Sequence, residues 1–524
     1  MSGESGEFAA AWANLPEYLG WHVLLSLSAV LIGVCLSLPL AIVSSRSALL
    51  RGPTLAFASI VQTIPGLALL ALFYPILLAL SAITHSLFGF GIRAFGYLPA
   101  LAALTLYSML PIVRNTITGL QGVDRAVMTA ARAVGMTAGQ SLRIVELPLA
   151  APIIVAGIRT AAVWVIGTAT LSTPVGQTSL GNYIFTGLQT ENWVFVLFGC
   201  VAAAVLALSV DRLLALAEEG VARRSATRLA AAIAGLAIII GASVFPLLRT
   251  GPERPVVVGT KSFDEQFILG SLMERRLREA GFRTVRRDGL GSTILFRALA
   301  SGDVDVYVDY SGTIWSNIMK RRDLPTRAQV LAEMADWLKR KYGISYVGPL
   351  GFENAYAFAM RSDRADALHI HSLADLAAYA PNMKIGGDYE IFSRPEWRSV
   401  ERTYGIKFGV ERQYQSNFMY RAVETGDVDV ISAFSSDGRI AQYGLRLLTD
   451  PKGALPPYDA VLLVSPAHSN DRPFLAALGP LIGKIDLATM QRANLMVDRD
   501  TDKRSPDEVA RMLDTSIGLH KLSH

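Results

Sequence analysis

The sequence predicts two domains of different class: an all-α polytopic membrane domain with about six transmembrane helices, then an α/β domain with two lobes. Six apolar stretches in the first 250 residues are long enough to cross a bilayer. The same residues contain no lysine, and charged residues make up only 18% of the chain. After residue 254, short β-branched runs alternate with amphipathic helical segments, as in a mostly parallel sheet. We therefore place the membrane domain at residues 1–250 and the second domain at residues 254–524.

The apolar stretches also predict how the chain is oriented. A helix needs about 20 residues to cross the hydrocarbon core. The spans are placed near residues 22–43, 54–80, 97–117, 150–172, 193–213 and 229–248. Arginines cluster in the loops that follow the first, third and fifth spans. By the positive-inside rule these loops face the cytoplasm. We therefore expect an inner-membrane protein whose even number of spans returns the second domain to the outer side.

The cytoplasmic loop at residues 122–149 carries a motif. It reads as two short helices, because Gly135 can take a positive φ and end the first helix, while Pro148 suits the start of the next span. The spacing resembles the EAA loop of ABC-importer permeases, which docks into the ATPase subunit, although Thr129 replaces the usual Glu. The alternative is an ordinary alanine-rich hairpin. The resemblance assigns ATPase docking to Thr129, Ala130, Ala131, Gly135, Leu147 and Pro148.

The sequence also predicts which partners the chain needs. A phosphate-binding G-x-x-x-x-G-K-[ST] motif is absent from it, so we expect a transport subunit, not an enzyme, with ATP hydrolysis in a separate ATPase subunit. ABC importers use two membrane domains and this chain has one, which implies a homodimer. The net charge of +5 reflects arginines at span ends, so we expect no nucleic-acid partner. We expect no cofactor and no metal, because His369 and His371 lack a third ligand nearby.

Two segments of the second domain echo each other. Residues 298–306 (ALASGDVDV) resemble residues 422–430 (AVETGDVDV), and each reads as the end of a helix, a tight turn and a strand. Two similar α/β lobes predict a clamshell whose strands end at a shared cleft. Ligands of such sheets bind at the carboxyl ends of the strands.

The second domain resembles the substrate-binding proteins of the glycine betaine/carnitine/choline family over nearly all of residues 255–520. The strings that carry the resemblance are residues 259–270, 309–313, 352–357 and 436–440. The resemblance implies a type II clamshell of the periplasmic-binding-protein kind. A branch that imports ergothioneine, sometimes also as a fused chain, is a close relative.

The resemblance also implies a ligand site. A quaternary ammonium has no N–H to donate, but aromatic faces attract it by about 2 kcal/mol when desolvated, and the family uses a cage of tyrosines. Phe392 and Tyr389 would complete the wall of this cage. Ser292 or Thr293 would either cap the helix that follows or face a ligand carboxylate. The predicted ligand-binding residues are Gln266, Ser292, Thr293, Tyr310, Thr313, Tyr356, Phe392, Tyr420 and Asp437.

These observations favour the fused permease and substrate-binding subunit of an ABC importer for quaternary ammonium osmoprotectants such as glycine betaine, choline or carnitine. One alternative is an ergothioneine importer of the same family. Another is a ligand-responsive channel gated by the clamshell, which the docking loop disfavours. A third is an enzyme on the same fold, but the second domain offers no nucleophile with its base and no metal cluster.

Overall fold

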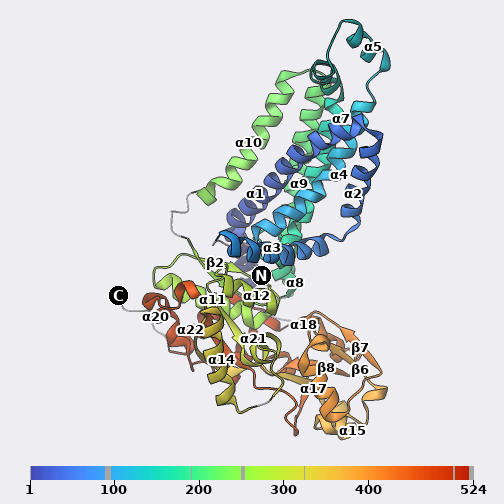
Figure 1. Ribbon diagram of the computed structural model, residues 1–524. Helices are drawn as coiled ribbons and strands as arrows, with labels where there is room; N and C mark the ends of the chain where they lie inside the picture. The colour runs from blue at the N-terminus through green and yellow to red at the C-terminus, as the bar shows by residue number, and fades with distance from the viewer. Residues whose placement is uncertain are drawn as a thin grey trace. The chain divides into compact units, whose positions relative to one another are not determined.

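The computed structural model describes residues 2–88, 96–189, 192–248, 254–323, 325–499 and 502–518. The chain divides into two compact units, one built mainly from residues before Pro252 and the other mainly from Glu253 onward. Figure 1 shows the first unit as helices alone and the second as a mixture of strands and helices.

The membrane unit contains six helical segments long and apolar enough to span a bilayer, which confirms the expected all-α class. They are Ala11–Arg46, Gly66–Phe88, Tyr97–Gln121, Ala138–Val175, Trp193–Ala222 and Ala226–Pro246. The helices of this unit are α1 (Ser2–Arg46), α2 (Ala48–Thr63), α3 (Gly66–Phe88), α4 (Tyr97–Gln121), α5 (Arg125–Ala133), α6 (Ala138–Ser141), α7 (Leu147–Ala169), α8 (Gly181–Gln189), α9 (Trp193–Ala222) and α10 (Ala226–Leu248).

The second span does not begin near residue 54 as the apolar run predicts. The run is broken between α2 and α3, where Ile64 has the extended angles φ −72° and ψ 128°. The residue before a proline is pushed out of the helical region by the proline ring, and Pro65 follows Ile64 directly. Hydropathy alone joins α2 to α3, whereas only Gly66–Phe88 qualifies as a span.

Small residues let α4 and α7 pack closely. An added Cβ at Gly157 would lie 2.9 Å from the carbonyl oxygen of Pro111, and one at Gly119 would lie 3.2 Å from Ala150. Membrane helices associate through such small residues, because lipid supplies no hydrophobic drive for their contact. These two glycines hold α7, which follows the docking loop, against α4.

The docking loop forms two short helices, as its sequence predicts. Asp124 caps α5 by accepting a hydrogen bond from the amide of Ala126 at 2.8 Å, and Gly135 after this helix has φ +79°. The second part differs from the prediction. A π-helical turn, Leu142–Glu146, joins α6 to α7 without a break, so the helical run starts at Ala138 and Pro148 lies inside it, in the first turn of α7.

The second unit contains two five-stranded sheets with the same topology. The first has the order β2-β1-β3-β10-β4 and the second β7-β6-β8-β5-β9. In each sheet the first three strands are parallel and the fourth runs antiparallel to both neighbours. The sheets are therefore mixed and not mostly parallel. The strands are β1 (Val256–Gly259), β2 (Thr284–Arg287), β3 (Val306–Tyr310), β4 (Ser345–Glu353), β5 (Tyr356–Arg361), β6 (Lys384–Gly387), β7 (Val410–Gln413), β8 (Val430–Phe434), β9 (Leu445–Leu448) and β10 (Asp459–Val464).

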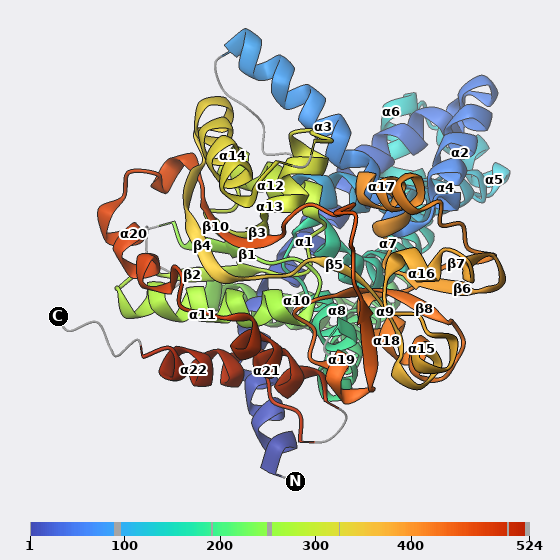
Figure 2. The same cartoon turned by 90° about the horizontal axis from the view of Figure 1, so that it is seen from below.

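Helices cover both faces of the first sheet. Figure 2 shows α11 and α22 along one side of this sheet, with α12 and α14 along the other. The helices of this unit are α11 (Asp264–Glu279), α12 (Ser292–Ser301), α13 (Ser311–Thr313), α14 (Arg327–Tyr342), α15 (Ser362–Leu368), α16 (Leu373–Leu376), α17 (Pro395–Tyr404), α18 (Ser416–Glu424), α19 (Arg439–Gln442), α20 (Arg472–Leu478), α21 (Leu487–Asp498) and α22 (Pro506–Ser516).

The internal echo marks equivalent positions in the two lobes. The first copy ends α12 and leads into β3, and the second ends α18 and leads into β8. Both strands stand third in their sheet orders. Gly302 and Gly426 take φ +75° and +82° in the two turns, a left-handed conformation that glycine adopts without a Cβ penalty. The two-lobed architecture predicted from the echo is confirmed.

The chain crosses between the lobes twice. β4 of the first sheet leads into β5 of the second, and the chain returns from β9 into β10. The two crossing segments are joined to each other, because the amide of Asn354 donates a hydrogen bond to the carbonyl of Tyr458 at 3.0 Å. Two short crossings tied in this way form the hinge of the clamshell.

Candidate ligand-binding cleft

A cavity of about 130 Å³ lies where the two lobes meet. Strands β1, β3, β6 and β8 all end at it, as expected for ligand sites in α/β sheets. Its size suits a small metabolite more than a drug-sized ligand. The lining residues are Lys261, Ser262, Phe263, Leu290, Ser292, Tyr310, Thr313, Asn354, Tyr356, Asp388, Tyr389, Glu390, Arg394, Ser416, Phe434 and Tyr458.

Five aromatic rings from both lobes and the hinge form one continuous wall of this cavity. Phe263 stacks on Phe434, with centroids 5.8 Å apart and planes 8° from parallel, and also on Tyr310, at 6.1 Å and 27°. Tyr356 lies 5.2 Å from Phe434 and meets Tyr458 edge-on at 5.7 Å. Because each ring contacts the next, the wall forms only when both lobes and the hinge are in place.

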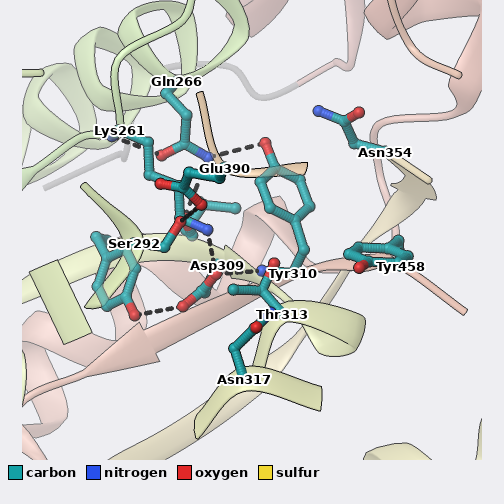
Figure 3. Close-up of polar contacts among 12 residues, drawn as sticks. Lys261, Gln266, Ser292, Asp309, Tyr310, Thr313, Asn317, Asn354, Glu390 and Tyr458 are labelled. Carbon is teal, nitrogen blue, oxygen red and sulfur yellow. Dashed lines mark hydrogen bonds and ion pairs between the residues drawn. The ribbon is translucent and has the colours of Figure 1, made fainter. Parts of the chain in front are cut away.

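The three tyrosines of the wall have fixed hydroxyl groups. The Tyr310 hydroxyl donates to Glu265 Oε1 and accepts from Gln266 Nε2 at 2.9 Å. The Tyr356 hydroxyl donates to Asp388 Oδ2 at 2.9 Å. Burial raises the pKa of both tyrosines well above the ordinary range, so they remain neutral donors. Figure 3 shows Gln266 reaching the hydroxyl of Tyr310.

Tyr458 completes this pattern from the return crossing. Its hydroxyl donates to Glu396 Oε1, a carboxylate that is 2% exposed. Burial raises the pKa of Tyr458 well above its usual value. All three tyrosines of the aromatic wall therefore donate to a buried carboxylate.

Two cations line the cleft beside these rings. The Lys261 ammonium lies 4.9 Å from the centre of the Tyr310 ring and pairs with Asp309 Oδ1 at 2.5 Å (Figure 3). The Arg394 guanidinium lies 5.3 Å from the centre of the Tyr356 ring and pairs with Glu390. Although burial opposes it, Arg394 and Lys261 hold the pKa of Glu390 below its usual value.

Two polar atoms of the lining are left without partners among the described residues. Arg394 Nε and Asn354 Oδ1 are both buried and make no hydrogen bond. The Asn354 amide orientation is fixed, because its Nδ2 donates to Glu265 Oε1 at 3.0 Å. A buried polar atom without a partner costs about 1–3 kcal/mol. Arg394 and Asn354, both lining residues, thus each keep one polar atom without a hydrogen-bond partner.

Some of the predicted site residues meet at this cleft. Tyr310, Tyr356, Thr313 and Ser292 line it, as does Tyr389. Gln266 lies behind the wall, where its Nε2 also donates to the carbonyl of Val308 at 3.1 Å. The family resemblance therefore indicated residues on the first-lobe side of the cleft and at the hinge.

Other predicted site residues lie outside the lining. Tyr420 is fully buried in a separate core cluster, under the guanidinium of Arg439, which pairs with Asp437 at 2.6 Å. Phe392 packs edge-on against Trp397, with centroids 5.1 Å apart. Thr293 is exposed on α12. None of these lines the cavity, because helical and strand geometry turns each side chain into a core or to solvent.

The expectation that Ser292 or Thr293 caps α12 is wrong. The N-cap is Gly291, which makes no side-chain cap, and Ser292 is already the first helical residue. The Ser292 hydroxyl instead bonds across the cleft to Glu390 Oε2 at 3.3 Å and to Arg394 Nη2 at 3.4 Å. A residue that faces a cleft from the first helical turn is free to make such contacts.

Several lining residues were not singled out from the sequence. Lys261, Phe263 and Asn354 belong to the strings that carry the resemblance, and their place after a strand or between strands is the signal that could have found them. Arg394 and Tyr458 follow no such pattern. They reach the cavity only because the lobes close on each other and the chain returns through the hinge.

The predicted docking residues lie in the membrane unit. Thr129, Ala130, Gly135 and Pro148 are exposed, Leu147 is half-buried, and Ala131 is buried. The neighbouring Glu146 is 4% exposed and pairs with Arg46 at the end of α1 at 2.6 Å. The loop thus presents a small-residue face while an ion pair ties its far end to the first span.

Both halves of the chain match families of known proteins. Residues 33–223 match the binding-protein-dependent transport system inner membrane component, and residues 254–513 match the substrate binding domain of the ABC-type glycine betaine transport system. The choline transport system permease protein of Bacillus subtilis (strain 168) is 40% identical over 198 residues, which are 38% of this chain and 84% of the relative. The chain belongs to the family of binding-protein-dependent importer permeases. It is a multi-pass inner-membrane permease fused to its own substrate-binding domain.

Two further relatives cover the binding domain. The ergothioneine transport permease/ergothioneine binding protein of Helicobacter pylori (strain G27) is 29% identical over 486 residues, 90% of this permease and 84% of the relative. The crystal structure of a glycine betaine/carnitine/choline ABC transporter is 28% identical, with a TM-score of 0.44, and covers 50% of this chain and 98% of its own. The predictions of the family, of the fold class and of the membrane location are confirmed.

Proposed function

We propose that this permease imports a small zwitterion that carries a quaternary ammonium and a carboxylate, by capturing it in the cleft between the two lobes. The observation that carries the proposal is the continuous aromatic wall, Phe263 to Tyr458, with Arg394 beside it. Wall and cation offer separate places for the two ends of such a ligand.

The wall suits the ammonium end. Quaternary ammonium groups are held by aromatic faces, with about 2 kcal/mol or more gained when the site is desolvated. Tyr310 and Tyr356 are the cage residues in this proposal, as the sequence predicts, with Phe263, Phe434 and Tyr458 added by the structure. Gln266 acts indirectly, because it holds the hydroxyl of Tyr310.

Arg394 suits the carboxylate end. Its Nε is buried without a partner, and its Nη atoms lie 3.4 Å from the hydroxyl of Ser292 and 3.5 Å from that of Thr313. A carboxylate arriving there would accept from the guanidinium and from both hydroxyls. Charge-assisted hydrogen bonds of this kind are about twice as strong as neutral ones.

The names of the relatives agree with a quaternary ammonium ligand. They are described as transporters of choline, of carnitine, of glycine betaine and of ergothioneine. Glycine betaine, carnitine and ergothioneine carry a carboxylate and choline does not. The position of Arg394 therefore leads us to propose a carboxylate-bearing member as the preferred ligand.

Ergothioneine is a second candidate on a specific observation. Asn354 Oδ1 needs a hydrogen-bond donor, and glycine betaine has none. The ring N–H groups of ergothioneine are donors. The relative that matches 90% of this chain is an ergothioneine permease and binding protein.

We also propose that a separate ATPase subunit drives import and that two copies of the chain form the pore. The chain lacks a phosphate-binding motif. The exposed face of the docking loop, from Thr129 to Pro148, is the proposed ATPase contact. Membership of an importer family supports this role over a ligand-gated channel.

The proposal is tested by calorimetric titration of the full-length chain in lipid nanodiscs with glycine betaine, carnitine, choline and ergothioneine. We expect one carboxylate-bearing ligand to bind with a Kd at least tenfold below that of choline, and Tyr310→Ala and Tyr356→Ala to abolish this binding. Choline binding as tightly as the zwitterions would refute the carboxylate assignment. A folded protein that binds none of the four would refute the quaternary-ammonium assignment.

A further inference from the structure

The carboxylates behind the cleft tyrosines form a set. Glu265, Asp388 and Glu396 come from three separate segments, and each accepts a hydrogen bond from one tyrosine of the wall. They are 3%, 6% and 2% exposed. Glu265 and Glu396 are not part of the cavity lining, so a ligand in the cavity does not touch them.

The donors around Glu265 and Asp388 favour the ionised forms of these two carboxyls. Glu265 accepts from Tyr310 and Asn354 at Oε1 and from Asn494 Nδ2 at Oε2, 3.1 Å away. Asp388 Oδ1 accepts from the backbone amides of Glu390 and Ile391 at 2.8 and 2.7 Å. A carboxyl with donors at both oxygens has no place for its own proton. Burial raises the pKa of Glu265 and of Asp388, and these hydrogen bonds to the charged form oppose that rise.

The charge on this set is not cancelled by the cations of the cleft. Lys261 is already paired with Asp309, and Arg394 with Glu390. Arg394 also approaches Glu396, but only to 4.0 Å. When ionised, the three tyrosine-bonded carboxylates leave excess negative charge around the aromatic wall.

We propose that Glu265, Asp388 and Glu396 are positioning residues that set the affinity of the cleft for a cation through the tyrosine rings. The proposal rests on the proposed function and explains how the wall selects positive charge. A phenol that donates to an anion gains electron density on its ring, which strengthens the attraction of the ring face for a cation. In a buried site the carboxylate charge itself also acts over this distance. A neutral group of the same shape would be attracted neither by the stronger ring face nor by the carboxylate charge.

The test compares two ligands of one shape on the full-length chain in nanodiscs. Glycine betaine and 3,3-dimethylbutanoate differ only in the central atom, nitrogen with a positive charge or neutral carbon. In Glu265→Gln and in Glu396→Gln we expect the Kd for glycine betaine to rise about five- to tenfold, where tenfold corresponds to 1.4 kcal/mol. The Kd for 3,3-dimethylbutanoate should change less than about twofold, since contacts and shape are kept.

A matched control uses a tyrosine–carboxylate pair outside the lining. Tyr404 donates to Asp450, and neither residue lines the cavity. Asp450→Asn should leave both Kd values unchanged. Tyr310→Phe keeps the ring and removes the bond to Glu265, so it should reproduce the charge-selective loss even if a Glu265 variant fails to fold.

Two results would overturn the inference while leaving the proposed function intact. One is an equal loss for both ligands, which would make the carboxylates purely structural. The other is no change in either Kd value in folded variants. A wild-type chain that fails to bind any quaternary amine is a different result, because it would overturn the proposed function itself.

Discussion

Arg394 is one of the residues through which the second lobe contacts the first across the cleft. It follows β6 and lies just before α17, yet its guanidinium reaches the hydroxyls of Ser292 and Thr313 in the first lobe. Its side chain is 7% exposed. A buried cation shared by both lobes can bind the ligand and hold the closed form at once.

This position predicts how the ligands will be discriminated. Arg394→Gln should raise the Kd for glycine betaine by about 10- to 100-fold, because hydrogen bonds to charged groups contribute about 1.5–3 kcal/mol. The Kd for choline, which has no carboxylate, should rise several times less. Titration of both ligands measures this, with Arg398→Gln, an exposed arginine of α17, as the control. Equal losses for the two ligands would show that Arg394 only holds the lobes together.

At the scale of elements, α11 and α21 meet at a crowded group of buried charges. Asp264 begins α11 and Asp498 ends α21, and both face Arg439, which also pairs with Asp437. Burial raises the pKa of Asp264, with the Arg439 charge opposing it. Burial raises the pKa of Asp498 well above its usual value, against the same opposing charge. Lys503 lies near enough to act on Asp264 as well.

The sign of this shift predicts a pH dependence of stability. An acid whose pKa is raised on folding keeps its proton in the native state after the unfolded chain has lost it, so stability falls as pH rises above about 4 toward the native pKa. Asp498→Asn removes this cost. Its melting temperature relative to wild type should therefore increase between pH 5 and pH 8, by roughly 2–4 °C per kcal/mol. Thermal melts at both pH values measure it, and a constant difference between the two proteins would contradict the assignment.

The turn at Gly135 in the predicted docking loop should affect how the chain works with its ATPase subunit. Gly135 has φ +79° with nothing within 4 Å of an added Cβ, so Gly135→Ala would suffer backbone strain alone, of about 1–2 kcal/mol. We expect several-fold weaker ligand-stimulated ATP hydrolysis with the ATPase subunit, and an unchanged ligand Kd. Gly139→Ala is the matched control, because Gly139 lies in α6 with equal space and no positive φ. A similar loss in both variants would remove the turn geometry as the cause.

At the scale of the whole molecule, the membrane unit supplies only one of the two membrane domains that an ABC importer needs. Six candidate spans belong to this chain. We expect native mass spectrometry of the purified complex to find two chains with two ATPase subunits, and therefore two binding domains for each pore. The chain alone should hydrolyse no ATP. A complex with a single copy of this chain and a different permease would contradict the homodimer.

Local sequence patterns were enough to predict the class of each half, the number of spans, the helical cytoplasmic loop and the repeated lobe. These features depend on local patterns: apolar runs of bilayer length, arginines at span ends, and the turn that follows α12 and recurs after α18. The family resemblance indicated Tyr310 and Tyr356, and the structure places both at the cleft, where one strand ends and another begins. The break before Gly66 was missed, since hydropathy averages over a single proline.

Which side chains share the cavity depends on the packing of the two lobes. Tyr458 and Arg394 are distant in sequence from Phe263 and from each other, and they meet it only after the chain has crossed the hinge twice. The same folding carries Tyr420 and Asp437 away from the lining, although Asp437 belongs to a string that carries the family resemblance. The spacing of residue types along the chain predicts a helix or strand and which of its faces is buried. Contacts between lobes depend on the closure of one sheet against another, which local pattern does not encode.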